Sequence, residues 1–161
     1  MGWLIAAFCL LLLVVLWGKF QKTDYPYQKQ KALFSPAERS FLGALERAIG
    51  KNAKIFGKVR IADVVTPKPG LSRSRWQSAF NRISRKHFDF VLCRKSDLSV
   101  LCAIELDDRS HRLKQRQKRD HFVSGVCRTA GLPMIQVPAR SFYAVNELRQ
   151  LIWPYLGRGS N

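Results

Sequence analysis

Carboxylates within and directly after two apolar segments are the residues of this chain best suited to chemistry. Asp89 lies inside the first segment, and Glu105 and Asp107 come at the end of the second. Carboxylate oxygens are hard ligands that suit Mg²⁺ or Mn²⁺, and such an ion can activate water against a phosphodiester. If these carboxylates lie close together without a cation between them, they repel, and one takes up a proton. The three acids therefore indicate a metal site.

The two apolar segments are predicted to pair as a hairpin. Residues 87–93 and 99–106 are separated by a short polar stretch, which is typical of antiparallel strands joined by a turn. If the turn is centred on the middle of that stretch, Asp89 and Glu105 are cross-strand neighbours with Cβ atoms about 5 Å apart. Asp107 shares their face, because alternate residues of a strand point the same way. A slip of one residue would put the first two acids on opposite faces.

Further candidates follow the second strand. His111 fits a general acid or base, a metal ligand, or a loop histidine without a catalytic role. Arg119 and Asp120 are candidate accessory residues, although Asp120 also suits neutralising Arg116 one helical turn earlier. The non-catalytic alternative for Asp107 is that it caps the following loop and pairs with neighbouring arginines.

A dense run of bases also follows this strand. Its members are Arg112, Lys114, Arg116, Lys118 and Arg119. Residues 73–86 are rich in arginine too, and the whole chain has 28 Lys and Arg against 11 Asp and Glu, a net charge of +17. Such a balance favours a polyanionic partner, either nucleic acid or anionic lipid headgroups. The two segments predict a phosphate-binding surface, and the alternative for the first is a solvated helix face.

The elements that must position these groups are predicted from periodicity and capping residues. In a helix over residues 34–50, Ser35 suits the N-cap and Glu38 the third position of a capping box. Glu38 is either this cap or a group that points into an active site. A strand is predicted over 53–65, a basic loop and short helix over 66–86, a helix over 113–130, a strand over 134–138 and a helix over 144–156. This order predicts an α/β fold.

The N-terminal segment predicts a membrane anchor. Residues 2–18 are apolar and uncharged, are bracketed by two tryptophans and are followed by lysines. This pattern is typical of a short transmembrane helix whose C-terminal side faces the cytoplasm. A cleaved signal peptide and a buried or interfacial helix are the alternatives. Residues 19–33 are interpreted as a basic juxtamembrane linker, 34–156 as one domain in the cytoplasm, and 157–161 as a tail.

Four stretches taken together resemble the bacterial DUF2726 family. They are "SPAERSFLGAL", "FDFVLC", "AIELDDRSH" and "RQKRDHFVSGVCRTAGLPMIQV". The family is placed in the PD-(D/E)xK, restriction-endonuclease-like superfamily, and the chain is also similar to very-short-patch-repair-like nucleases. The resemblance covers about Phe34 to Val137. It implies a mixed sheet flanked by helices in α-β-β-β-α-β order, in a bacterial protein. Together with the predicted N-terminal anchor, this predicts a single-pass protein of the inner membrane.

The resemblance also implies roles by position. Asp89 matches the motif aspartate of the second core strand, and Glu105 matches the (D/E) of (D/E)xK. Glu38 matches a first-helix glutamate that assists metal binding in some members. Asp107 stands where the superfamily usually has a lysine that orients the attacking water. His111, Arg119 or a lysine from elsewhere would have to replace it, or catalysis is lost.

Three functions are open from the sequence. The first is a membrane-anchored, Mg²⁺- or Mn²⁺-dependent nuclease with Asp89, Glu105 and Asp107 as ligands and His111 as acid or base. The second is a catalytically inert nucleic-acid-binding module of the same fold. The third is a scaffold that binds headgroups or another protein.

Overall fold

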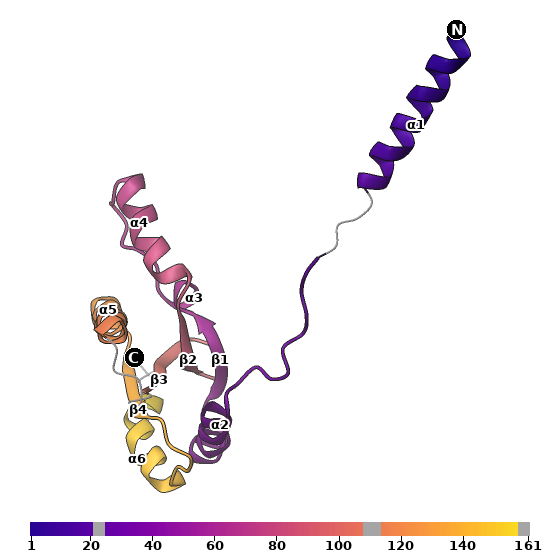
Figure 1. Ribbon diagram of the computed structural model, residues 1–161. Coiled ribbons are helices and arrows are strands. Elements are labelled where there is room, and N and C mark those ends of the chain that lie inside the picture. Colours follow the sequence, from indigo (N-terminus) through magenta and orange to yellow (C-terminus); the bar gives the residue numbers. More distant parts are fainter. Residues whose placement is uncertain (21–24, 108–113, 158–161) are drawn as a thin grey trace. The chain divides into compact units, whose positions relative to one another are not determined.

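The computed structural model in Figure 1 describes residues 1–20, 25–107 and 114–157, without the side chains of 16–20 and 114–120. The chain divides into two compact units, residues 1–33 and 34–161, each of which is described by itself.

The first unit contains the helix α1 (Gly2–Phe20). The apolar side chains described along it are exposed, including Trp3 at 75% and Leu10 at 66%. Within the described part of the chain, no helix is both long and apolar enough to cross a membrane. The membrane span predicted over residues 2–18 therefore finds no support, although the segment is helical as predicted.

The second unit is built on one mixed four-stranded sheet flanked by helices, which confirms the predicted α/β architecture. Its strands are β1 (Lys54–Arg60), β2 (His87–Cys93), β3 (Val100–Asp107) and β4 (Met134–Pro138). They lie in the order β1-β2-β3-β4. The first three are antiparallel, and β4 runs parallel to β3.

The hairpin of β2 and β3 has the predicted register. Phe90 pairs with Ile104, which is the pairing that the predicted turn position implies. Beyond this pair, the Leu106 N–H donates to the Asp89 side chain. A bulge beside the turn absorbs one residue. Within the turn, an Asp97 carboxylate oxygen accepts a 2.9 Å hydrogen bond from the backbone N–H two residues later. The bulge is confined to the turn end of the hairpin, so it does not move the acids at the other end.

Helix α2 (Pro36–Ile49) begins at the predicted capping box. The Ser35 hydroxyl oxygen accepts the Glu38 N–H at 3.3 Å, and Glu38 Oε2 accepts the Ser35 N–H at 2.7 Å. The helix buries one apolar face, which includes Phe41 and Leu45. The capping interpretation of Glu38 is thus confirmed, and it leaves the second carboxylate oxygen, Oε1, for another contact.

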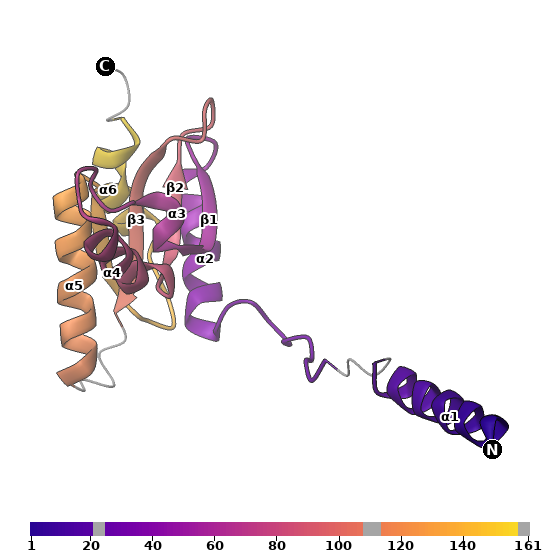
Figure 2. The ribbon, with the colours of Figure 1, turned by 90° about the horizontal axis from the view of Figure 1, so that it is seen from above.

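Two apolar clusters hold the sheet between its helices. One joins α2 and α6 (Val145–Leu156) to Phe90 and Ile104. The other joins α3 (Ile61–Val64), α4 (Arg73–Ser84) and α5 (Lys114–Ala130) to Val91 and Ala103. In Figure 2, α4 and α5 lie in front of the sheet. The two clusters bury alternate residues of β2 and β3, as expected of a sheet that is covered on both faces.

The strand predicted over 53–65 is wrong in its second half. It ends at Arg60, and Ile61–Val64 form the single helical turn α3. The Ile61 N–H donates to the Lys86 carbonyl at 2.8 Å, and the Ile61 side chain is buried in the second cluster. Turning the chain here lets the apolar run pack against α4 instead of extending past the sheet.

The large ring of Phe41 should dominate the stability of the first cluster. It is fully buried and lies 5.4 Å from the Phe90 ring and 5.0 Å from the Tyr143 ring, between centroids. We expect Phe41→Ala to lower the free energy of unfolding by about 3–5 kcal/mol, measured by urea denaturation. Phe142→Ala is the control, because that ring is 74% exposed. Equal losses in the two variants would contradict this packing.

Candidate active site

Lys58 of β1 joins two carboxylates that come from different elements. Its Nζ contacts Oε1 of Glu38 in α2 and lies 3.6 Å from Oδ1 of Asp89 in β2. The side chains of Glu38 and Asp89 are only 13% and 19% exposed. Because a cation between two carboxylates offsets their repulsion, the ammonium allows both acids to stay ionised in a poorly solvated place.

The backbone at Lys58 is bent in a way that non-glycine residues seldom adopt. Its φ is 56°, in the left-handed region. Gly57 pairs with Phe90 and Val59 pairs with Phe88, and the pairing of β1 with β2 is interrupted between them, at Lys58 and Asp89. A Cβ at Gly57 would collide with the ring of Phe34. Strained backbone of this kind is concentrated at functional sites, where the surrounding structure holds it.

Asp89 lies at this interruption of the β1–β2 pairing, and its side chain bonds to the backbone of β3 on its other side. Its Oδ2 accepts the backbone N–H of Leu106 at 2.9 Å. Burial raises the pKa of the Asp89 carboxyl above its usual value, and the nearby Glu38 charge acts in the same direction. The hydrogen bond from Leu106 and the charge of Lys58 oppose this rise in pKa. Asp89 is therefore a carboxylate held in place by β3 and tuned by its two charged neighbours.

The other two groups are held in their charged forms. Burial acts to raise the pKa of Glu38, but the hydrogen bonds from Lys58 and Ser35 outweigh it, so this pKa is lowered. Burial likewise acts to lower the pKa of Lys58, but Glu38 and then Asp89 outweigh it, so this pKa is raised. Each partner thus stabilises the ionised form of the other.

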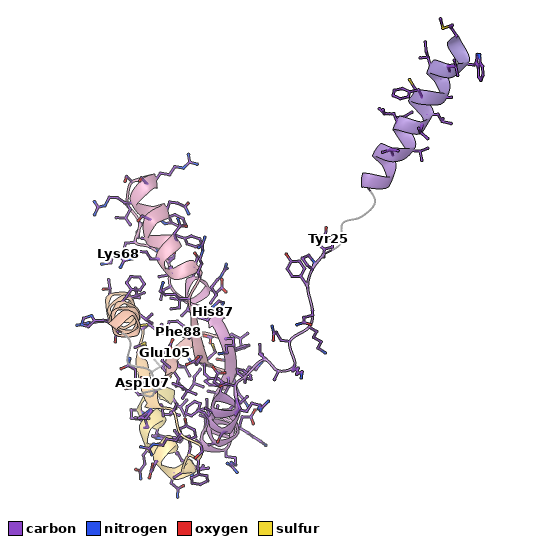
Figure 3. All side chains as sticks on the ribbon, in the orientation of Figure 1. Tyr25, Lys68, His87, Phe88, Glu105 and Asp107 are labelled. Atoms are coloured by element: carbon purple, nitrogen blue, oxygen red, sulfur yellow. The ribbon has the colours of Figure 1, made fainter. Side chains whose placement is uncertain are left out.

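Glu105 lies beside Asp89 in the sheet and faces α5. Its Oε1 is buried. Burial, with the Glu105 charge as a second cause, raises the pKa of the Cys127 thiol on α5 to about 11. Asp107 comes two residues later at the exposed end of β3, level with Pro138 of β4. Figure 3 labels Glu105 and Asp107 along this strand.

The donor chemistry fits a hard divalent cation that is only partly held by protein. Among the residues that the structure describes, no three His, Cys, Asp or Glu side chains lie close enough to hold a metal ion together. Mg²⁺, however, usually keeps several waters and takes one or two carboxylates plus substrate phosphates. Asp89 of β2 and Glu105 of the adjacent strand β3 are carboxylates of the kind that such an ion takes.

Several predicted site residues lie outside the described part of the chain. His111 and Arg112 belong to residues 108–113, and for the first turns of α5 only the backbone is described. The side chains concerned are those of Lys114, Arg116, Lys118, Arg119 and Asp120. Their proposed roles in catalysis or phosphate binding stay predictions.

Lys58 is the residue that sequence reasoning missed. The sequence predicts that a lysine from elsewhere can replace the motif lysine, but it does not indicate which lysine. The signal was present in "KIFGKVR", where a lysine follows a glycine inside a strand. It becomes visible only when β1 is paired with β2, because that register sets Lys58 opposite Asp89.

The sequence profile described as "Protein of unknown function (DUF2726)" matches residues 30–155 of the chain. The chain belongs to the DUF2726 family. The family predicted from the four sequence stretches is therefore confirmed. No curated protein and no solved structure matched the chain. For this DUF2726 protein, the geometry around Lys58 is thus the main basis for reasoning about activity.

Replacing Lys58 should make stability depend differently on pH. Because the pKa of Glu38 is lowered from 4.5, its ionised form stabilises the fold above pH 4.5, and this stabilisation is lost as the pH falls through the folded pKa. Because the pKa of Lys58 is raised from 10.5, its charged form stabilises the fold below pH 10.5. At pH 7 both contributions are present. We expect Lys58→Gln to lower the free energy of unfolding by about 1–2 kcal/mol at pH 7. The loss should shrink as the pH falls below 4.5.

Urea denaturation at several pH values between 3 and 7 measures this effect. Lys54→Gln is the matched control, because Lys54 lies on the same strand and is exposed. A loss that does not change with pH, or that the control reproduces, would contradict the ionic contact.

Proposed function

We propose that this protein hydrolyses phosphodiester bonds of nucleic acid with Mg²⁺ or Mn²⁺, as a restriction-endonuclease-like fold of the PD-(D/E)xK type. The observation that carries the proposal is the ammonium of Lys58 beside Asp89. It supplies from β1 the amine that is missing at Asp107, where the superfamily motif usually has its lysine. In this proposal the carboxylates come from β2 and β3, and the amine comes from β1.

Each residue of the site has a chemical role in this proposal. Asp89 and Glu105 hold the metal ion from neighbouring strands. A bound divalent ion would lower the pKa of an attacking water and offset charge on the phosphate. Lys58 donates a hydrogen bond to a phosphate oxygen or to that water, which stabilises developing negative charge. Glu38 is a positioning residue, because its Oε1 holds the ammonium while Oε2 caps α2.

The charge of the chain supports a nucleic-acid substrate. Residues 64–88 contain six Lys and Arg and no Asp or Glu. This segment includes α4 and the loop before it, which belong to the same compact unit as the carboxylates. Bases without neighbouring acids leave a positive surface that can neutralise backbone phosphates and release counterions. The same feature is expected whether or not the bound strand is cleaved.

A second candidate function is an inert nucleic-acid-binding module of the same fold. Two observations favour it. Lys58 already offsets the charges of Glu38 and Asp89, and the described residues contain no three-ligand metal group. In that case the ionic cluster would only stabilise the fold, and binding would be sensitive to salt but independent of metal.

Cleavage of mixed DNA and RNA by the full-length chain with Mg²⁺ or Mn²⁺ separates the two. We expect Asp89→Asn, Glu105→Gln and Lys58→Gln each to lower the cleavage rate by about 100-fold, the loss typical when one stabilising group is removed. Asp63→Asn should leave the rate unchanged, because that exposed carboxylate pairs with neighbouring Arg60 and is not part of the proposed site.

Binding of Mn²⁺, followed by electron paramagnetic resonance, gives a readout besides activity. Asp89→Asn and Glu105→Gln should weaken it, whereas Asp63→Asn should not. Cleavage that survives in both carboxylate variants would refute the mechanism. Salt-sensitive binding of nucleic acid by the wild-type protein, without cleavage in either metal, would favour the inert module.

A further inference from the structure

A groove with mostly apolar walls lies beside the arginine-rich helix α4, away from the carboxylates. Its volume is about 560 Å³, and it is formed by the loop before α4, by α4 itself and by α5. The apolar lining includes Val65, Leu71, Ala79, Ile83, Phe122 and Val126. A volume of this size is typical of pockets for small molecules or single nucleotides.

One wall of the groove combines a flat aromatic ring with positive charge. The guanidinium carbon of Arg82 lies 4.2 Å from the centroid of the Phe122 ring, and Lys86 Nζ lies 5.4 Å from it. Lys68, labelled in Figure 3, lines the loop side of the groove. Within the described residues, none of these three cations forms an ion pair with a carboxylate. The groove is therefore apolar inside and cationic at its edge.

We propose that this groove binds an unpaired base of a nucleic-acid strand, while the cations at its edge bind the adjoining phosphates. Exposed bases stack on aromatic rings and on arginine guanidinium planes, and here the Arg82 guanidinium lies over the Phe122 ring. A base inside a duplex is already stacked and paired, so only a single-stranded or extruded base can enter. The segment of residues 64–88 has six Lys and Arg and no Asp or Glu, so it favours a polyanion over a neutral or basic peptide.

This inference deepens the proposed function by naming a substrate class, and it rests on that proposal only in taking nucleic acid as the ligand. If the groove and the carboxylates serve one substrate, that substrate has an unpaired segment near the bond that is cleaved. An anionic lipid shares the phosphate charge, but it offers no flat ring to stack on Phe122.

A glycine on the groove wall allows a test that changes no charge. Gly125 lies within α5 and lines the groove, and an added Cβ there meets nothing within 4 Å. The leucine side chain of Gly125→Leu should therefore occupy part of the groove. Gly43→Leu in α2 is the matched control, because its added Cβ also meets nothing within 4 Å. Ala79→Leu narrows the groove from the α4 side and replaces Gly125→Leu if that variant does not fold.

The measurement is fluorescence anisotropy of a labelled single strand and of its duplex, with the full-length chain in neutral detergent and excess EDTA. We expect Gly125→Leu to weaken single-strand binding about tenfold, the loss of one stacked base, and to leave duplex binding unchanged. Gly43→Leu should change neither. An equal loss for strand and duplex, or no loss, overturns the proposal. The proposal is also overturned if phosphatidylglycerol vesicles displace the strand from the wild-type chain but not from Gly125→Leu, because the groove then binds lipid.

Parallel cleavage assays distinguish this inference from the proposed activity. If the wild-type chain cleaves but Gly125→Leu binds single strands normally, the groove proposal is wrong and the activity stands. If no cleavage occurs in either metal while Gly125→Leu selectively weakens single-strand binding, the activity is wrong and the groove proposal stands.

Discussion

The contact of Lys58 with Glu38 and Asp89 is the interaction on which the candidate site depends. It links β1, β2 and the first turn of α2 through one ammonium. Without that cation, two poorly solvated carboxylates would repel and one would be driven to take up a proton. The left-handed backbone at Lys58 is held in place by neighbours on both sides, including the Phe34 ring over Gly57.

One segment of the second unit is basic and contains no acid, whereas the candidate carboxylates lie elsewhere. The carboxylates Asp89 and Glu105 lie on the two central strands, whereas residues 64–88 carry bases without a single acid. This separation matters because a phosphate backbone would be repelled by exposed acids. Near Asp89, Lys58 reduces that repulsion before any metal binds. Attraction by α4 can therefore act on a nucleic acid without being cancelled at the sheet.

The fold was largely predictable because its signals are local. The capping box at Ser35 and the register of the β2–β3 hairpin both follow from short stretches of sequence. The strand predicted over 53–65 failed, because the turn at Ile61 depends on a hydrogen bond to Lys86 and on burial against α4. The role of Lys58 was not predictable from the sequence for the same reason. Its partners lie 20 and 31 residues away, so its role depends on how strands pair and on where α2 docks.

The position of the amine has a consequence for how the site would work. A lysine two residues after Glu105 would belong to the same strand as the metal ligand, and its placement would follow from the strand alone. Here the amine comes from β1 and is held by Glu38, which also caps α2. Its position therefore depends on the docking of a helix, and a change at the helix N-terminus would reach the reacting phosphate through Lys58.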